Sequence, residues 1–508
     1  MDWLKLPEPD RRLAPAFTDP AGARGWIAGQ PQAQPLAMLA ALDAQVRAVD
    51  GADLPPASAG ELLGILRATA VPLLAASETR YMRKALPLLP DDQRAFEAAR
   101  QLWRDFGIAH LRLAARLPRE NAAPLLHQAA GSLRMAQYVH FQAAQACPPE
   151  LDRLLLGILG LAGELGVLGV ALTDPDFAPL GPGHIGGLLA WAFLLRRTDP
   201  YRLSAPQLVV ANRALRRWRE LCEFQAAPAS RVDIVELAPL FPEPLPDGIP
   251  GTLEIHRLRR KIRQRLAALE AGDSPESLKL GRELSGAACI RLLHELDRAF
   301  RPSGPATPAV DGELELVFGC DDAYALFAGR ELNRPASETR PSAIAHQRMA
   351  IFGFDRPSEL PDAARKPQLA TERWLQRGGE QHRPAMPAGP RRLSPCLVAA
   401  TLPDDAALGV LQGLYCDAGG ALRGTVRWYP GRIRAAAFLP PSGGTQRAAA
   451  FVIDDGKQAS LLVPASAGTR IDSPLRLEEE TAPRRLGEVL ERGADFVRYA
   501  LEANGDAG

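Results

Sequence analysis

The periodicity of the apolar residues changes once along the chain, and this change constrains the fold more than any other feature. Up to about Phe300, apolar residues recur three or four positions apart, as on one face of a helix. After a stretch rich in proline and arginine, short segments read as strands joined by tight turns. A pattern with the helical period does not suit a strand. The sequence therefore predicts an α+β multidomain chain, with an N-terminal all-α helical array followed by a small C-terminal antiparallel β-barrel.

The helical part is predicted as a series of segments bounded by Pro, Gly or Asp. No strict repeat length relates them, so the array is not assigned to a named class of helical repeat. A proline-rich connector at 225–251 separates the last two helices from the others. The expected helices cover residues 34–48, 61–74, 91–117, 122–146, 151–172, 185–197, 205–224, 253–271 and 282–300.

Strand patterns begin at 313–319, where apolar and acidic residues alternate, and return in quick succession after Leu393. Residues 331–392 are polar and poorly periodic, which favours a linker. The expected hairpins are 408–429, 447–463 and 485–501, with further strands at 432–439 and 470–477. Four domains follow: a helical domain at 1–225, a connector with a basic helix, a second helix and a strand at 226–330, the linker at 331–392, and the barrel at 393–508.

Composition narrows the classes of function. A chain of 508 residues is too long for one core. Lys plus Arg is 60 and Asp plus Glu is 59, so overall charge predicts neither a nucleic-acid partner nor binding to a membrane surface. Six scattered cysteines without a Cys-x-x-Cys pair are typical of reduced thiols. With no charged and apolar leader at the N-terminus, we expect a cytoplasmic location.

One apolar run, Leu154–Leu172, is long enough to be considered as a membrane span. It carries Glu164 near its middle, and a carboxylate inside a bilayer is costly. We therefore expect a buried helix or helix pair here and no transmembrane span.

Several short motifs occur in a fixed order along the chain: TDPYRLS at 198–204, GRELS at 281–285, ELELVFG at 313–319, GTVRW at 424–428 and LERGADFVRY at 490–499. Together they resemble large proteobacterial proteins that combine a helical body with a C-terminal PilZ-type domain. The resemblance covers most of the chain and is clearest after Leu188.

The resemblance implies a receptor-type role in cyclic di-GMP signalling. The family's barrel binds this dinucleotide through an R-x-x-x-R element and a later D/N-x-S-x-x-G element. Two guanidinium groups suit the first task, because arginine forms planar, bidentate bonds to phosphate and stacks on guanine. Arg373 and Arg377 have the required spacing, whereas the segment near Ser394 lacks the second element.

A second basic feature is the predicted helix at 253–271. Arg259, Arg260 and Arg263 are its candidate contacts for an acidic partner or a polyphosphate. The alternative is a solvated helix with some salt bridges, since its basic residues spread over more than one face and no aromatic residues are interleaved for stacking on nucleic-acid bases.

Two functions from different classes follow. The first is a PilZ-type signalling effector that couples cyclic di-GMP binding to a protein partner. The second is a helical scaffold or adaptor with a degenerate barrel that binds no nucleotide. We expect no enzyme, no cofactor and no metal site, because the sequence contains no nucleophile elbow, P-loop, Cys/His dyad or metal-ligand spacing.

Overall fold

A computed structural model describes residues 4–226, 233–301, 311–332, 369–386, 389–402, 405–441, 446–456, 459–478, 480 and 482–501. The chain divides into two compact units. The helical unit comprises Met1–Thr307 with Tyr415–Gly420, and the β unit comprises Pro308–Leu414 with Ala421–Gly508. The predicted fold class is confirmed, since helices precede antiparallel sheets that include a closed barrel.

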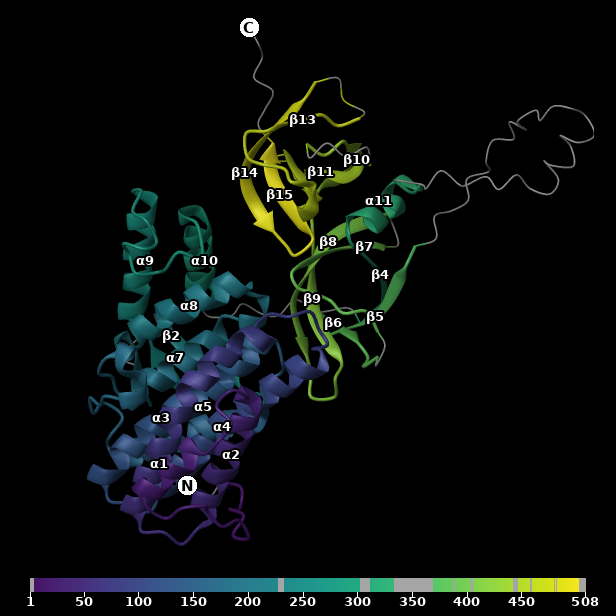
Figure 1. The fold of residues 1–508 in the computed structure, drawn as a ribbon. Helices are drawn as coiled ribbons and strands as arrows, with labels where there is room; N and C mark the ends of the chain where they lie inside the picture. The colour runs from purple at the N-terminus through teal and green to yellow at the C-terminus, as the bar shows by residue number, and fades with distance from the viewer. Residues whose placement is uncertain are drawn as a thin grey trace, which may run out of the picture. The chain divides into compact units, whose positions relative to one another are not determined.

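One continuous apolar core holds the helices of the helical unit together. Figure 1 shows the course of these helices. Five helices begin with a proline (α1, α2, α3, α4 and α6), a residue favoured at this position because the first N–H of a helix has no partner inside it. The helices are α1 (Pro20–Ala28), α2 (Pro35–Gly51), α3 (Pro56–Tyr81), α4 (Pro90–Ala114), α5 (Arg119–Ala143), α6 (Pro149–Glu164), α7 (Ile185–Arg197), α8 (Ala205–Trp218), α9 (His256–Glu270) and α10 (Gly286–Ala299).

The proline-rich connector is more ordered than expected. Part of it forms a small antiparallel sheet with the order β1-β3-β2. The strands are β1 (Glu223–Gln225), β2 (Ile234–Glu236) and β3 (Thr252–Glu254). Leu253 and Val235 are buried in the helical core, so this segment is part of the helical unit and not a free linker.

One helix of the described chain, α3, is long and apolar enough to cross a membrane. It packs among α2, α4 and α5, and Arg67 near its middle pairs with Asp174 and Asp176. A core helix passes the same length and composition test, so α3 is weak evidence for a span. The apolar run at 154–172 is divided, because α6 ends at Glu164 after 16 residues.

The first part of the β unit is a closed barrel with the strand order β4-β5-β6-β9-β8-β7. The barrel begins earlier than expected. Its first strand, β4, precedes the segment 331–392 that the sequence predicted as a linker, and β5 and β6 lie within that segment. Residues 333–368 of that linker lie outside the described residues. The strands are β4 (Gly312–Phe318), β5 (Thr371–Arg377), β6 (Glu380–Arg383), β7 (Cys396–Thr401), β8 (Ala406–Cys416) and β9 (Leu422–Trp428).

The second part of the β unit is a six-stranded sheet with the order β10-β11-β12-β15-β14-β13. The two parts therefore have the same topology. Numbered by their order along the chain, the six strands of each part lie side by side in the order 1-2-3-6-5-4. A bridge between Phe438 and Leu477 brings the two edges of the second sheet together. The strands are β10 (Arg432–Phe438), β11 (Ala448–Asp454), β12 (Ala459–Pro464), β13 (Pro474–Leu475), β14 (Arg484–Arg492) and β15 (Phe496–Leu501).

A short helix, α11 (Cys320–Ala328), joins the two parts of the β unit. Its residues share one apolar cluster with strands of the barrel and of the second sheet. Tyr324 of α11, Leu397 of β7 and Phe451 of β11 are buried members of this cluster. Where the sequence predicted a single barrel at 393–508, the β unit thus has two six-stranded parts that begin with β4 and share one apolar cluster.

Candidate functional site

Arg373 and Arg377 lie on β5, within the barrel wall. Side chains alternate along a strand, so both arginines point outward while Trp374 is fully buried inside. The two arginines are four positions apart on the strand, which places their Cα atoms about 13 Å from each other. Two arginines at this distance reach separate phosphates more readily than they clamp one.

Acidic residues accompany both arginines on this outer face. The Arg373 guanidinium donates a hydrogen bond to Glu313 of β4, which raises the pKa of Arg373, and Glu315 lies opposite it in the strand register. Glu380 of β6 lies opposite Arg377. A phosphate bound here has to compete with these carboxylates for the arginines.

The R-x-x-x-R spacing occurs again in β9, at Arg423 and Arg427. Arg427 pairs with Glu491 of β14 at 2.5 Å, and its guanidinium lies 5.1 Å from the ring centre of Tyr429. Arg498 of β15 lies 4.8 Å from the same ring. We call Arg427, Tyr429, Glu491 and Arg498 the arginine–tyrosine cluster.

The arginine–tyrosine cluster is partly buried and carries two guanidinium groups against one carboxylate. Its tyrosine hydroxyl donates to Glu491 at 3.0 Å, and burial followed by the Glu491 charge raises the pKa of Tyr429, so the hydroxyl stays protonated. The Nε atom of Arg498 donates to Ser460 of β12 at 2.9 Å. The excess of positive charge suits an anionic ligand better than the outer face at Arg373 does.

An acidic turn lies close to the segment that follows Arg427. Asp454, the last residue of β11, pairs in register with Arg432, the first residue of β10. Gly431 has a φ of 87°, and a Cβ atom there would lie 2.0 Å from the carbonyl oxygen of Asp454. Only glycine allows this approach, which brings the arginine element and the Asp454–Gly456 turn together.

The repeated spacing was visible in the sequence but not recognised there. Its position just before a second run of six strands is the signal that could have found it. The D/N-x-S-x-x-G element does not occur anywhere in the sequence. In the second six-stranded part, the segment most similar to this element is the turn that begins at Asp454. There Gly456 occupies the position of the serine.

The three arginines singled out on α9 have different environments. Arg259 is engaged inside the unit, because its guanidinium pairs with Asp233 and bonds Asp297 at 2.9 and 3.0 Å. It therefore fastens α9 to α10, and this contact competes with the predicted role in partner binding. Arg263 is exposed.

Arg260 lines an open groove of about 380 Å³ on the helical unit. Arg217, Arg257 and Lys261 line the same groove, and Glu220 is its acidic member. The excess of positive charge makes this groove the part of α9 best suited to an acidic segment of a partner.

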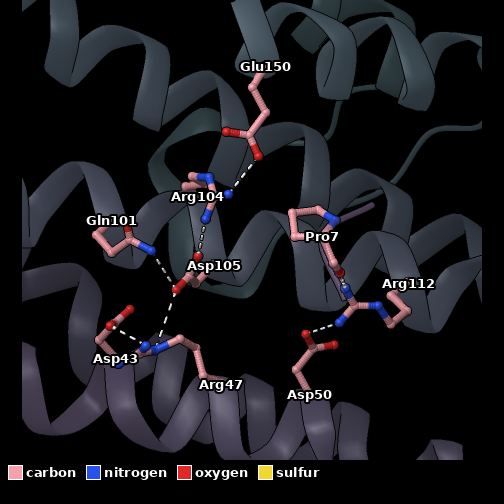
Figure 2. A network of polar contacts seen from close by, with 9 residues as sticks. All are labelled: Pro7, Asp43, Arg47, Asp50, Gln101, Arg104, Asp105, Arg112 and Glu150. Atoms are coloured by element: carbon pink, nitrogen blue, oxygen red, sulfur yellow. Dashed lines mark hydrogen bonds and ion pairs between the residues drawn. The ribbon is translucent and has the colours of Figure 1, made fainter. Parts of the chain in front are cut away.

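Two neighbouring carboxylates, one buried and one partly buried, belong to a polar network inside the helical unit (Figure 2). Asp43 of α2 lies near Asp105 of α4, and burial together with the Asp105 charge raises the pKa of Asp43 to about 7. Arg47 lies 3.3 Å from Asp43, and Arg104 joins Asp105 to Glu150 of α6. The network ties α2, α4 and α6 together.

Comparison with known proteins bears on the helical unit. The family model described as cyclic-di-GMP receptor FimW, N-terminal domain, matches residues 21–229, which run from α1 to just beyond β1. No curated protein and no solved structure matches the chain. Residues 21–229 of this chain are thus similar to the N-terminal domain of a cyclic-di-GMP receptor.

Proposed function

We propose that this protein is a cytoplasmic receptor for cyclic di-GMP, with a β unit of the PilZ type, and that it acts on a protein partner rather than as an enzyme. The match of residues 21–229 to a receptor's N-terminal domain carries this proposal. The six-stranded parts of the β unit and the R-x-x-x-R spacings in β5 and β9 support it.

In this proposal the phosphates of cyclic di-GMP bind at the arginine–tyrosine cluster. Arg427 and Arg498 supply charge-assisted hydrogen bonds, and their planar groups offer a stacking surface for guanine. The second element is replaced by the Asp454 turn, whose backbone amides and carboxylate are near the arginine element. The outer-face pair Arg373 and Arg377 remains the competing prediction.

Two double variants of the full chain separate these positions. Isothermal titration with cyclic di-GMP is expected to show roughly tenfold or greater weakening for Arg427→Ala/Arg498→Ala, because each lost charged hydrogen bond is worth about 1.5–3 kcal/mol. Arg373→Ala/Arg377→Ala is expected to bind like the unchanged protein. The reverse ranking would move the site to the outer face of β5. Equal binding by all three proteins would exclude both.

We further propose that the basic groove at Arg260 receives an acidic segment of the protein partner. Ligand binding influences the partner only if cyclic di-GMP binds one state of the chain more tightly than another. A pull-down with the unchanged chain and with Arg260→Glu/Lys261→Glu, each with and without cyclic di-GMP, tests this coupling. Loss of a partner in the variant supports the groove.

The alternative function, a scaffold without nucleotide, is favoured by the missing D/N-x-S-x-x-G element. Under that alternative, the same partner is recovered in equal amount with and without cyclic di-GMP, and titration gives no heat. Under the receptor proposal, the recovered amount changes with the nucleotide.

A further inference from the structure

The helical unit contains a cavity of about 310 Å³ that neither arginine element uses. It lies among α3, α5, α7 and α8, all within residues 21–229. Met82, Met135, Leu188 and Val209 supply apolar walls. The polar and aromatic lining includes Glu78, His127, Arg134, Tyr138, Trp191 and Asn212.

Arg134 of α5 is the unusual member of this lining. Its side chain is only 1% exposed, and among the described residues no carboxylate forms an ion pair with it. Its Nη2 atom donates to the Asn212 side chain, while its Nε atom has no hydrogen-bond partner in the described structure. A buried cation without a carboxylate is costly, and arginines in this position are normally paired.

Neighbouring aromatic rings stabilise Arg134 in part. Its guanidinium lies 3.3 Å from the ring centre of Trp191 and 4.8 Å from that of Tyr138. Trp191 donates to the same Asn212 oxygen at 3.1 Å, which fixes the amide that Arg134 uses. These contacts hold the guanidinium in place at the cavity wall. The Glu78 carboxylate interacts with its charge but forms no ion pair with it in the described structure.

The other charges around the cavity are largely committed elsewhere. Asp174 receives two hydrogen bonds at 2.8 Å from Arg67, and Arg213 pairs with Glu283 at 2.5 Å. Burial lowers the pKa of His127 to about 4, so this imidazole is neutral.

Two further charged groups line the cavity. They are Arg216 and Glu78, and burial raises the pKa of Glu78. Counting Arg134 and Arg216 against Glu78, the cavity carries an excess positive charge of about one.

We propose that this cavity binds a small organic monoanion, whose carboxylate or phosphodiester oxygens accept hydrogen bonds from Arg134 while its apolar part contacts the methionine, leucine and valine walls. Arg134 can offer a planar pair of N–H donors to either oxyanion. The volume is at the lower end for ligand sites, so the occupant is a compact molecule rather than a whole cyclic dinucleotide. This site is separate from the cyclic di-GMP site of the β unit.

Three aromatic probes test the charge requirement on the full chain. Benzoate represents the carboxylate, diphenyl phosphate the phosphodiester, and benzamide is the uncharged match for benzoate. Tryptophan fluorescence and thermal shift report binding, since Trp191 contacts Arg134. Saturable binding of at least one anion, roughly tenfold or more tighter than benzamide, is expected. No saturable binding of either anion, or equal binding of benzamide, would overturn the proposal.

Arg134→Met separates a ligand-binding role from a structural one. Methionine keeps most of the side-chain volume and removes the buried charge, so the ligand-free variant is expected to melt about 2 °C or more above the unchanged protein, and anion binding is expected to disappear. A lower melting temperature, or retained anion binding, would contradict the inference. Arg427→Ala/Arg498→Ala is the matched control and is expected to keep anion binding, so the result does not depend on the cyclic di-GMP proposal.

Discussion

Asp43 is expected to make the helical unit less stable as pH rises, whereas most carboxylates in folded proteins make it more stable. Burial, and then the charge of Asp105, raises its pKa from 3.8 to about 7. Its Oδ1 atom is buried without a hydrogen-bond partner in the described structure, which suits a protonated carboxyl better than a carboxylate. Replacing Asp43 with Asn, its neutral isostere, should therefore stabilise the protein at high pH.

The sign and size follow from linkage. Well below pH 3.8, Asp43 is protonated in both the folded and the unfolded chain, so it does not change the free energy of unfolding. Between the unfolded pKa of 3.8 and the folded pKa of about 7, only the unfolded chain releases the proton, and the free energy of unfolding falls as pH rises. A shift of this size corresponds to about 4 kcal/mol at most. Asp43→Asn removes the penalty, so we expect a gain of about 2–4 kcal/mol near pH 8 and almost none near pH 4.

Urea unfolding followed by far-UV circular dichroism, which reports mainly on the helices, measures this difference at several pH values. Asp53→Asn is the matched control, because Asp53 is an exposed carboxylate in the loop after α2, and it should show no comparable pH-dependent gain. A gain for Asp43→Asn that is the same at both ends of the pH range, or a loss near pH 8, would refute the reasoning.

Three further substitutions test the packing that holds the sites in place. Arg67→Ala should lower the free energy of unfolding by about 3–5 kcal/mol, because it leaves Asp174 and Asp176 without their buried partner; a change below about 1 kcal/mol in urea unfolding would contradict this. Gly431→Ala should cost at least about 1–3 kcal/mol, since its φ is 87° and a Cβ atom would meet the Asp454 carbonyl; an unchanged melting temperature would show that the turn adapts. Ser285→Ala should cost about 1 kcal/mol through loss of the cap to the Ala288 amide at the start of α10; denaturant unfolding with Ser285→Thr as the retained cap checks it.

The helices were predictable because apolar periodicity and flanking Pro, Gly or Asp residues act locally. The segment expected at 185–197 is α7, and the hairpin expected at 408–429 is β8 and β9. α7 is apolar and buried from Ile185 to Leu195, and β8 is largely apolar and buried, so the apolar runs in the sequence report directly on both elements.

Strands β5 and β6 were missed for a physical reason. Their inward positions include Glu372, Gln381 and Arg383, which lie inside the barrel with Trp374 and bond to one another or to the backbone. The alternation of apolar and polar residues that marks a strand is absent when the interior is itself polar. The segment therefore looked like a polar linker.

The functional geometry was even less accessible from the sequence. Arg134, Trp191 and Asn212 come from three helices, and nothing local to Arg134 shows that its charge is buried without an ion pair among the described residues. Arg259 shows the converse, because a basic helix suggested an exposed contact and the acids that engage it lie 26 and 38 residues away. Such pairings are fixed by tertiary packing and not by spacing in one segment.

The central claim is that this chain is a receptor for cyclic di-GMP, and isothermal titration of the purified full chain with that nucleotide tests it most directly. The account predicts saturable binding, micromolar or tighter, that GTP and cyclic di-AMP do not reproduce. An absence of heat together with an unchanged melting temperature at high nucleotide concentration would contradict the claim and favour the scaffold function.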